Sequence, residues 1–176
     1  MITRRQTLVA LGAVALVAPF GAFAQQQGKV WRVGFLAQRA RPDSLDSDIY
    51  GAFPRGMRAL GYVEGKNLAI EWRYADGDAA RLPELAAELI QLKVDVIVTA
   101  STPATNVAQK ATTTIPIVMG TIGDPVGSGF IASLAHPGGN ITGLSTITSD
   151  LSAKHLEMLL SMVPRLSRVA VLMHPD

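Results

Sequence analysis

The polar residues that could bind a small ligand lie in three short stretches, each at the end of a run of apolar residues. The stretches are Gln38-Arg39-Ala40-Arg41-Pro42, Ser101-Thr102-Pro103 and Thr121-Ile122-Gly123-Asp124-Pro125. Hydroxyls and amide groups at the start of a helix favour carboxylates and other polar anions. We therefore expect Ser101, Thr102 and Thr121 to donate hydrogen bonds to a carboxylate or another polar head group. The alternative is that the hydroxyls of Ser101 and Thr102 only cap the helix.

Other side chains of these stretches could orient the opposite end of such a ligand. Gln38 and Asp124 can accept hydrogen bonds from an amine or amide, although Asp124 could equally form a turn with Pro125. Arg39 and Arg41 could bind a carboxylate bidentately, or they could simply be solvated. The residues predicted to bind a ligand are therefore Gln38, Ser101, Thr102, Thr121 and Asp124.

A glycine-containing stretch, Gly127-x-Gly129-x-x-Ala132, matches the loose form of a dinucleotide-binding fingerprint. That fingerprint needs its first glycine in the turn directly after a strand, where the backbone reaches a pyrophosphate at a helix start. Here residues 121–126 separate the first glycine from the preceding apolar run, and residues 38–42 contain no glycine. We therefore interpret both glycines as turn residues and expect no bound cofactor.

The chemistry of catalysis and of metal binding finds little support in the residue types. The chain has no cysteine, so disulfides and thiolate metal sites are excluded, and His136, His155 and His174 are too far apart in sequence to form a spaced ligand pair. No G-x-S-x-G motif is present, and no paired carboxylates lie at matched strand ends. We therefore predict a protein that is not an enzyme and holds no metal.

The first 24 residues have the features of an export signal. Arg4 and Arg5 form a basic start, residues 8–20 form an apolar run too short to cross a bilayer, and Ala22-Phe23-Ala24 resembles a cleavage site. The paired arginines leave open whether export follows the general or the twin-arginine route. The export signal predicts a periplasmic protein. Removing residues 1–24 leaves 14 basic against 14 acidic residues, and this balance predicts no affinity for nucleic acid.

The remaining chain alternates short β-rich apolar runs with longer segments of helical period, which is typical of parallel βα units. The expected strands are 30–37, 67–74, 94–100, 115–120, 141–145 and 168–173, and the expected helices are 48–60, one from 82, one from 101, a short one at 130–134, and one from 149 or 150 to 163. Pro54 should delay or kink the first helix. Leu151, His155, Met158, Leu159 and Met162 should face a core. We expect one α/β lobe over 28–147, followed by a crossover helix and one strand over 148–176.

Several motifs occur in an order that resembles a known family. They are Gln38, Gly61-Tyr62-x-Glu64-Gly65-x-Asn67, Thr102-Pro103, Pro116-Ile117, Asp124-Pro125-Val126-Gly127 and Pro137-Gly138-Gly139-Asn140-x-Thr142-Gly143. The chain resembles, from about residue 30 onward, the ABC-transporter substrate-binding proteins whose best-understood members bind aromatic amino acids such as tryptophan.

The resemblance implies a type I periplasmic-binding-protein fold, in which two Rossmann-like lobes close on a small ligand and present it to a membrane permease driven by an ATPase. Gln38, the Ser101-Thr102 pair and residues 121–124 would then face the cleft from the first lobe. Members of that family are roughly twice as long, so the resemblance also implies that the second lobe is nearly absent here.

We therefore expect the exported solute-binding component of an ABC import system, with a small polar organic ligand such as an amino acid. Two alternatives stay open, a sensory ligand-binding module and a truncated fragment that binds nothing. An exported hydrolase on the same scaffold is a third alternative, because fold does not dictate function. An exposed interface between lobes could also make the chain dimerise.

Overall fold

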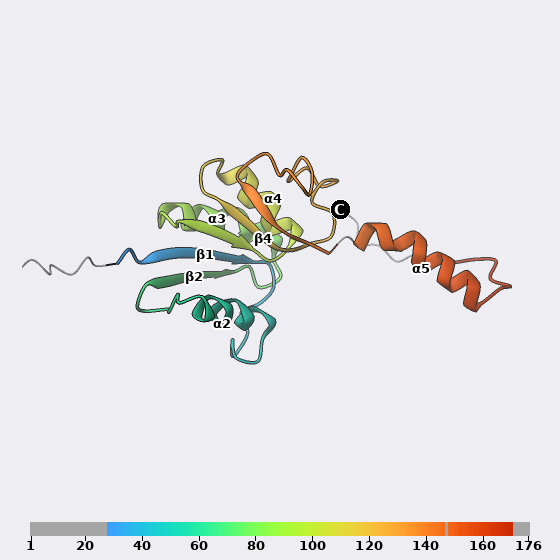
Figure 1. Ribbon diagram of the computed structural model, residues 1–176, viewed down its shortest axis with the longest axis horizontal. Coiled ribbons are helices and arrows are strands. Elements are labelled where there is room, and N and C mark those ends of the chain that lie inside the picture. The colour runs from blue at the N-terminus through green and yellow to red at the C-terminus, as the bar shows by residue number, and fades with distance from the viewer. Residues whose placement is uncertain (1–27, 147, 171–176) are drawn as a thin grey trace, which may run out of the picture.

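The computed structural model describes residues 28–146 and 148–170, and its centre is a five-stranded, all-parallel sheet (Figure 1). The strands are β1 (Trp31–Ala37), β2 (Leu68–Tyr74), β3 (Val96–Thr99), β4 (Ile117–Ile122) and β5 (Ile141–Ser145), in the order β2-β1-β3-β4-β5. Each expected strand up to residue 145 is confirmed to within two residues at either end. The predicted export signal lies outside the described residues.

Helices cover both faces of this sheet. A 3-10 turn, η1 (Ile49–Gly51), leads into α2 (Ala52–Ala59) on one face, and α3 (Leu82–Gln91) and α4 (Thr102–Ala111) pack on the other (Figure 1). Another 3-10 turn, η2 (Ala79–Arg81), precedes α3. Pro54 is the third residue of α2, where its missing N–H would have no helical partner, so the delayed start of this helix is confirmed.

The core is divided into two by the sheet. On the side of α3 and α4, the fully buried side chains include Leu36, Leu89, Ile97 and Ile117. On the side of α2, the buried residues Val33, Phe35, Leu68 and Ile70 pack with partly buried aromatic rings. Adjacent residues of β1 therefore enter different cores, as expected for a strand covered on both faces.

The connection between β4 and β5 contains no helix, so the helix expected at 130–134 is wrong. The N–H groups of Phe130 and Ile131 donate to the carbonyl of Pro125 at 3.0 and 3.3 Å, and the N–H of Ala132 donates to the carbonyl of Pro137. These partners are incompatible with the i to i−4 ladder of a helix. Phe130 and Ile131 are buried in the core beside α4, which explains their apolar character without a helix.

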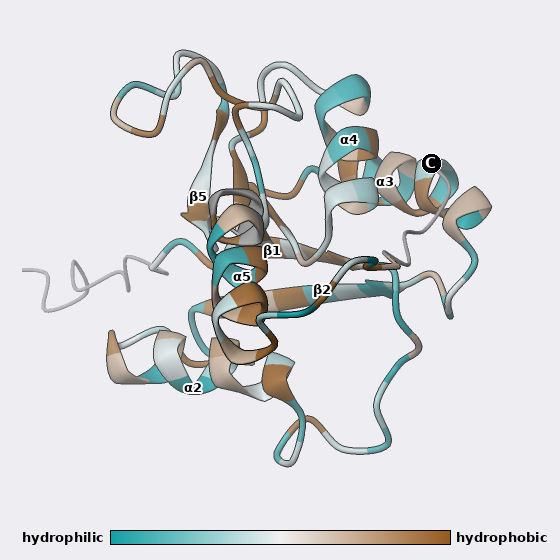
Figure 2. Cartoon of the chain, turned by 90° about the vertical axis from the view of Figure 1, so that its right-hand side faces the viewer, coloured by the Kyte–Doolittle hydropathy of each residue, from teal (hydrophilic) through white to brown (hydrophobic). Residues whose placement is uncertain are grey.

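The last helix, α5 (Thr148–Met162), projects away from the sheet (Figure 1). Its existence is confirmed, but the expectation that its apolar stripe faces a core is wrong. Leu151 is 46% exposed, Met158 53% and Met162 78%, because no other element among the described residues covers the helix (Figure 1). Figure 2 shows apolar segments, coloured brown, on this helix. Residues 166–170 have no regular structure, and the rest of the strand expected at 168–173 lies outside the described residues. None of the described helices is long and apolar enough to cross a membrane.

Candidate ligand-binding site

The candidate site lies where the sheet changes direction. From β1 the chain crosses over one face of the sheet to β2, and from β3 it crosses over the other face to β4, so the connections leaving the two adjacent strands diverge at their carboxyl ends. In open parallel sheets such a switch point forms the ligand-binding crevice. An open cavity of about 320 Å³ occupies this position, lined by Gln38, Arg39, Tyr50, Gly77, Ala100 and Ser101.

Gln38 is the first residue after β1 and is half-buried at the wall of this cavity. Its carbonyl accepts a hydrogen bond of 2.7 Å from the N–H of Gly77, which ties the end of β1 to the loop after β2. Among the described residues its side-chain amide has no hydrogen-bond partner. The backbone is therefore held in place while the amide remains able both to donate to and to accept from a ligand.

Ser101 caps α4 and lines the same cavity. Its Oγ accepts the N–H of Ala104 at 3.3 Å, and its carbonyl accepts the N–H and the hydroxyl of Thr105 at 3.0 and 2.9 Å. The capping interpretation is thus observed. It leaves the hydroxyl hydrogen of Ser101 free to donate to a ligand, so capping and binding are compatible.

A pair of buried threonines fixes the position of this cap. The hydroxyls of Thr99 and Thr105 lie 2.7 Å apart, and both residues are fully buried. Because the single hydroxyl hydrogen of Thr105 goes to the carbonyl of Ser101, Thr99 is the donor within the pair. The end of β3 and the first turn of α4 are therefore joined by a chain of hydrogen bonds that holds Ser101 at the cavity.

The remaining predicted residues, Thr102, Thr121 and Asp124, do not line this cavity. Thr102 is exposed at the first position of α4. Pro103 has no N–H, and the N–H of Ala104 already donates to Ser101. Of these three residues, only Thr102 therefore keeps an N–H that can donate to a ligand. Thr121 is exposed near the end of β4. Asp124 is exposed in the following turn, where its Oδ1 accepts the N–H of Gly127 at 2.7 Å. The turn role suggested for Asp124 is therefore observed, and one carboxylate oxygen remains.

Sequence reasoning missed Tyr50 as part of the cavity wall, and it missed Asp48, which contacts two residues of that wall. The carboxylate of Asp48 is only 10% exposed, forms an ion pair of 2.9 Å with Arg39, and accepts the N–H of Tyr50 at 2.8 Å. The Arg39 guanidinium lies 5.2 Å from the centre of the Tyr50 ring. Burial raises the pKa of Tyr50, an effect that Arg39 opposes and Asp48 increases, so its hydroxyl remains a donor at neutral pH. Because Asp48 pairs with Arg39, the charge of this arginine is already compensated.

A cluster of aromatic rings supports this wall from behind. The ring of Phe35 on β1 lies 5.1 Å from Tyr50, 5.6 Å from Phe53 and 4.5 Å from Trp72, measured between centroids. Such tilted pairs contribute about 0.5–1.5 kcal/mol each beyond the burial of their area. The spacing of Tyr50 and Phe53, one helical turn apart beside the expected strands, was the sequence signal that could have placed Tyr50 here.

Within the described part of the chain, no group of His, Asp and Glu side chains could hold a metal ion. Apart from Gln38, Thr102-Pro103 and Asp124-Pro125-Val126-Gly127, the motifs of the resemblance lie at or next to turns at the opposite edge of the sheet. Asn67 accepts the N–H of Val63 at 2.7 Å, and Asn140 donates to the carbonyls of Thr112 and Ile115 at 3.2 and 2.8 Å. These motifs explain the shape of the lobe rather than its ligand.

A parallel sheet with this strand order and a polar cavity at its switch point defines a Rossmann-like α/β lobe. The chain belongs to the ABC transporter substrate-binding protein family, whose family model matches residues 36–176. The predicted fold class, the Rossmann-like lobe of a type I periplasmic binding protein, is confirmed by this match and by solved relatives.

Three similar proteins illustrate the relationship. A tyrosine-binding protein of Clostridioides difficile is 33% identical over 137 residues, which cover 78% of this chain and 39% of that protein. The crystal structure of an ABC domain in complex with L-Trp from Streptococcus pneumonia is 31% identical, with a TM-score of 0.59 over 65% of this chain and 38% of the other. A conserved domain protein of Vibrio cholerae is 32% identical, with a TM-score of 0.66 over 78% and 45% of the two chains. The chain thus spans less than half the length of these relatives.

Proposed function

We propose that this chain supplies one lobe of an exported solute-binding protein for ABC import, which binds an amino acid with an aromatic side chain and catalyses no reaction. The observation that carries the proposal is the convergence of Gln38 and Ser101 on one cavity at the switch point of the sheet. The tyrosine-binding relative and the relative in complex with L-Trp support the ligand class. The family and the predicted signal support a permease partner and a periplasmic location.

Each polar group of the site has a role in this proposal. The hydroxyl of Ser101, the amide of Thr102 and the hydroxyl of Thr121 donate to the ligand carboxylate, at the positive end of the α4 dipole. Gln38 and the remaining carboxylate oxygen of Asp124 accept from the ligand ammonium. The phenol of Tyr50 offers an apolar ring face with a polar tip on the adjacent wall.

Self-association is a further part of the proposal. Six large apolar side chains of α5 are between 37% and 78% exposed. Apolar surface of this kind favours contact with another protein surface. The six side chains are Leu151, Leu156, Met158, Leu159, Leu160 and Met162. Sedimentation over a range of concentrations tests it, since a strictly monomeric chain at all concentrations would contradict self-association.

Calorimetric titration with L-Trp and L-Tyr, and with L-Ala as a small apolar comparison, tests the ligand. The sharpest variant is Ser101→Asp, because aspartate retains the cap of α4 but places a negative charge against the ligand carboxylate. Removing a hydrogen bond to a charged group costs about 1.5–3 kcal/mol, so we expect affinity to fall by about tenfold to a hundredfold or more, with the melting temperature nearly unchanged.

The matched control is Ser128→Ala, which removes an exposed hydroxyl from the loop before β5 and should leave both affinity and stability unchanged. An S101D protein that binds as tightly as the parent chain would overturn the assignment of the site. No heat with any amino acid, when a two-lobed relative responds under the same conditions, would mean that the chain is a fragment that does not bind.

A further inference from the structure

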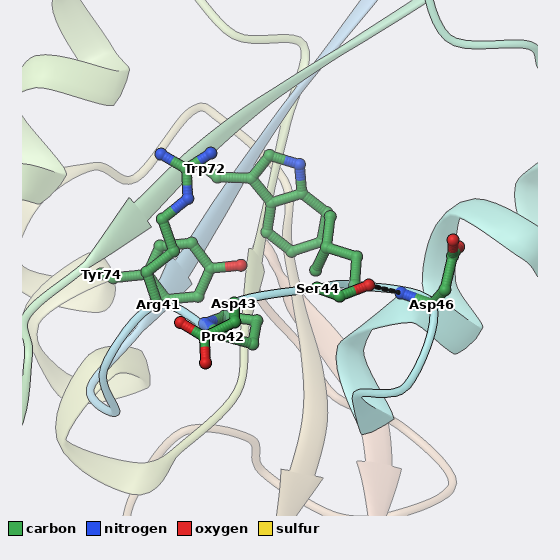
Figure 3. A pocket seen from close by; sticks show the side chains of 8 residues that line it. Arg41, Pro42, Asp43, Ser44, Asp46, Trp72 and Tyr74 are labelled. Carbon is green, nitrogen blue, oxygen red and sulfur yellow. Dashed lines mark hydrogen bonds between the residues drawn. The ribbon is translucent and has the colours of Figure 1, made fainter.

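A second cavity lies beside the first, between the loop that follows β1 and the end of β2 (Figure 3). Its volume is about 250 Å³, and its walls include Arg41, Ser44, Leu45, Trp72 and Tyr74. Tyr74 lines this cavity, Tyr50 lines the cavity at the switch point, and the centres of the two rings are 6.5 Å apart. The two cavities are therefore neighbours with separate linings.

The floor of the second cavity is an aromatic surface held in a fixed orientation. The rings of Trp72 and Tyr74, two residues apart on β2, stack at 5.9 Å with only 7° between their planes. Phe35 packs against Trp72 at 4.5 Å, and Tyr50 packs against Tyr74. Trp72 and Tyr74 are only partly buried, so the ring of each keeps a face or edge in the cavity. A planar ligand can stack on this surface without rearrangement of the protein.

Arg41 brings a positive charge to this aromatic surface. Arg39, two residues earlier, is paired with Asp48, whereas Arg41 has no ion pair among the described residues. Its guanidinium lies beside the two rings, on the opposite side of the loop from the carboxylate of Asp43, and the carboxylate of Asp46 points away from the rings (Figure 3). Burial raises the pKa of Tyr74, and the largest opposing influence is the charge of Arg41, which places the guanidinium near the phenol.

The backbone of Arg41 is anchored even though its charge is unpaired. Its N–H faces the carboxylate of Asp76, whose pKa is lowered chiefly by a hydrogen bond of 2.6 Å from Arg81 and also by this N–H. On the far side of the cavity, the N–H of Asp46 donates to the Ser44 hydroxyl at 3.2 Å. The loop therefore carries the guanidinium on a held backbone, which reduces the entropy lost when it binds an anion.

We propose that this second cavity binds a planar aromatic carboxylate of one or two rings, with the ring stacked on Trp72 and Tyr74 and the carboxylate held by Arg41. A guanidinium binds a carboxylate through two parallel hydrogen bonds, and the cavity is somewhat smaller than those that take drug-sized molecules. The site is separate from the proposed amino-acid site, and it needs no ammonium group on its ligand.

Tryptophan fluorescence tests this proposal directly, because the chain has two tryptophans and Trp31→Phe leaves Trp72 as the only one. The purified W31F protein is titrated with phenylacetate and, in parallel, with phenethylamine, which has the same ring and the opposite charge. We expect a saturable change of Trp72 emission with phenylacetate and none with phenethylamine. Equal responses to both compounds, or no response to phenylacetate, would overturn the proposal.

Two further variants in the W31F background locate the response. Arg41→Gln removes the charge and should weaken phenylacetate binding by about tenfold or more, whereas Arg58→Gln, which removes an exposed charge on α2, should have no effect. Melting curves of both variants establish that they are folded. Equal effects of the two substitutions would show that only net charge matters and would overturn the assignment to Arg41.

Ser101→Asp separates this proposal from the proposed function. That substitution acts in the cavity at the switch point, so phenylacetate should bind the S101D protein as it binds the parent. Loss of phenylacetate binding in S101D would place the compound in the amino-acid site and overturn the second site. Failure of amino-acid binding, by contrast, would leave this test unaffected, because phenylacetate has no ammonium group.

Discussion

The two edges of the sheet use polar side chains in different ways. At the amino edge, three polar residues directly precede a strand, and each is bonded within the chain. Asn67 bonds to Val63 and Gly61, Asp95 accepts from Arg32 and Lys29, and Asn140 donates to Thr112 and Ile115. These residues connect segments that are close in space, and their hydrogen-bonding capacity is largely used inside the protein.

At the carboxyl edge, the polar side chains keep unused capacity. Among the described residues, the amide of Gln38 has no partner, Arg41 has no ion pair, and Ser101 uses its oxygen but not its hydrogen. Groups satisfied within the chain contribute to stability, whereas groups that still need a partner can recognise a ligand. The comparison therefore predicts that substitutions at the two edges have opposite effects on stability and on binding.

The largest effect on stability is expected for Asn140→Ala. Its Nδ2 donates to the carbonyls of Thr112 and Ile115, and removing it leaves two part-buried acceptors without this donor. We expect the free energy of unfolding to fall by about 2–3 kcal/mol, measured by urea denaturation, with ligand affinity of the folded protein unchanged. Asn106→Ala is the matched control, because Asn106 is exposed on α4 and should tolerate alanine. Equal stabilities of the two variants would contradict a structural role for the amino edge.

The opposite result is expected for Gln38→Ala. The hydrogen bond that holds this residue uses its carbonyl, so removing the side chain should leave the urea midpoint unchanged. Loss of a hydrogen bond to the ligand ammonium should weaken amino-acid binding by about tenfold, measured by calorimetry. A Q38A protein that is destabilised as much as N140A would show that the two edges do not differ in the way proposed.

Most of the fold follows from local patterns in the sequence. Runs such as residues 30–37 are apolar throughout because both faces of the strand are covered, and Ser101 followed by Pro103 starts a helix because both residues suit a helix N-terminus. The helix predicted at residues 130–134 is wrong because Phe130 and Ile131 belong to a loop and are apolar for another reason, which is that they are buried in the core beside α4. The stripe on α5 shows a related limit, since a pattern indicates that a face suits burial but not which surface covers it.

The candidate site was predictable in part for a similar reason. Gln38 and Ser101 could be placed together because strands of a parallel sheet end at the same edge. The ion pair of Asp48 with Arg39, which supports the cavity wall, could not be predicted, because the two residues lie nine positions apart in an irregular loop. Such a contact joins residues whose types suggest only a solvated surface, and it becomes visible only in three dimensions.

The smallest predicted effect concerns Asp95 at the amino edge, and it depends on pH. The N–H of Arg32 at 2.8 Å, followed by the ammonium of Lys29 at 2.6 Å, lowers the pKa of this carboxyl, whose side chain is a quarter exposed. Its contribution to stability is present above the unfolded pKa of about 3.9 and is lost as the pH falls through the lower folded value.

Asp95→Asn removes this charge but retains an oxygen that can accept from Arg32. We therefore expect a loss of at most about 1 kcal/mol at pH 7, because a partly exposed ion pair is screened by solvent, and almost no difference from the parent near pH 2. Urea unfolding at both pH values, with Asp43→Asn as an exposed control, measures the change. A difference that stayed constant between the two pH values would mean that Asp95 acts through its shape and hydrogen bond rather than its charge, which would align it with Asn67 and Asn140.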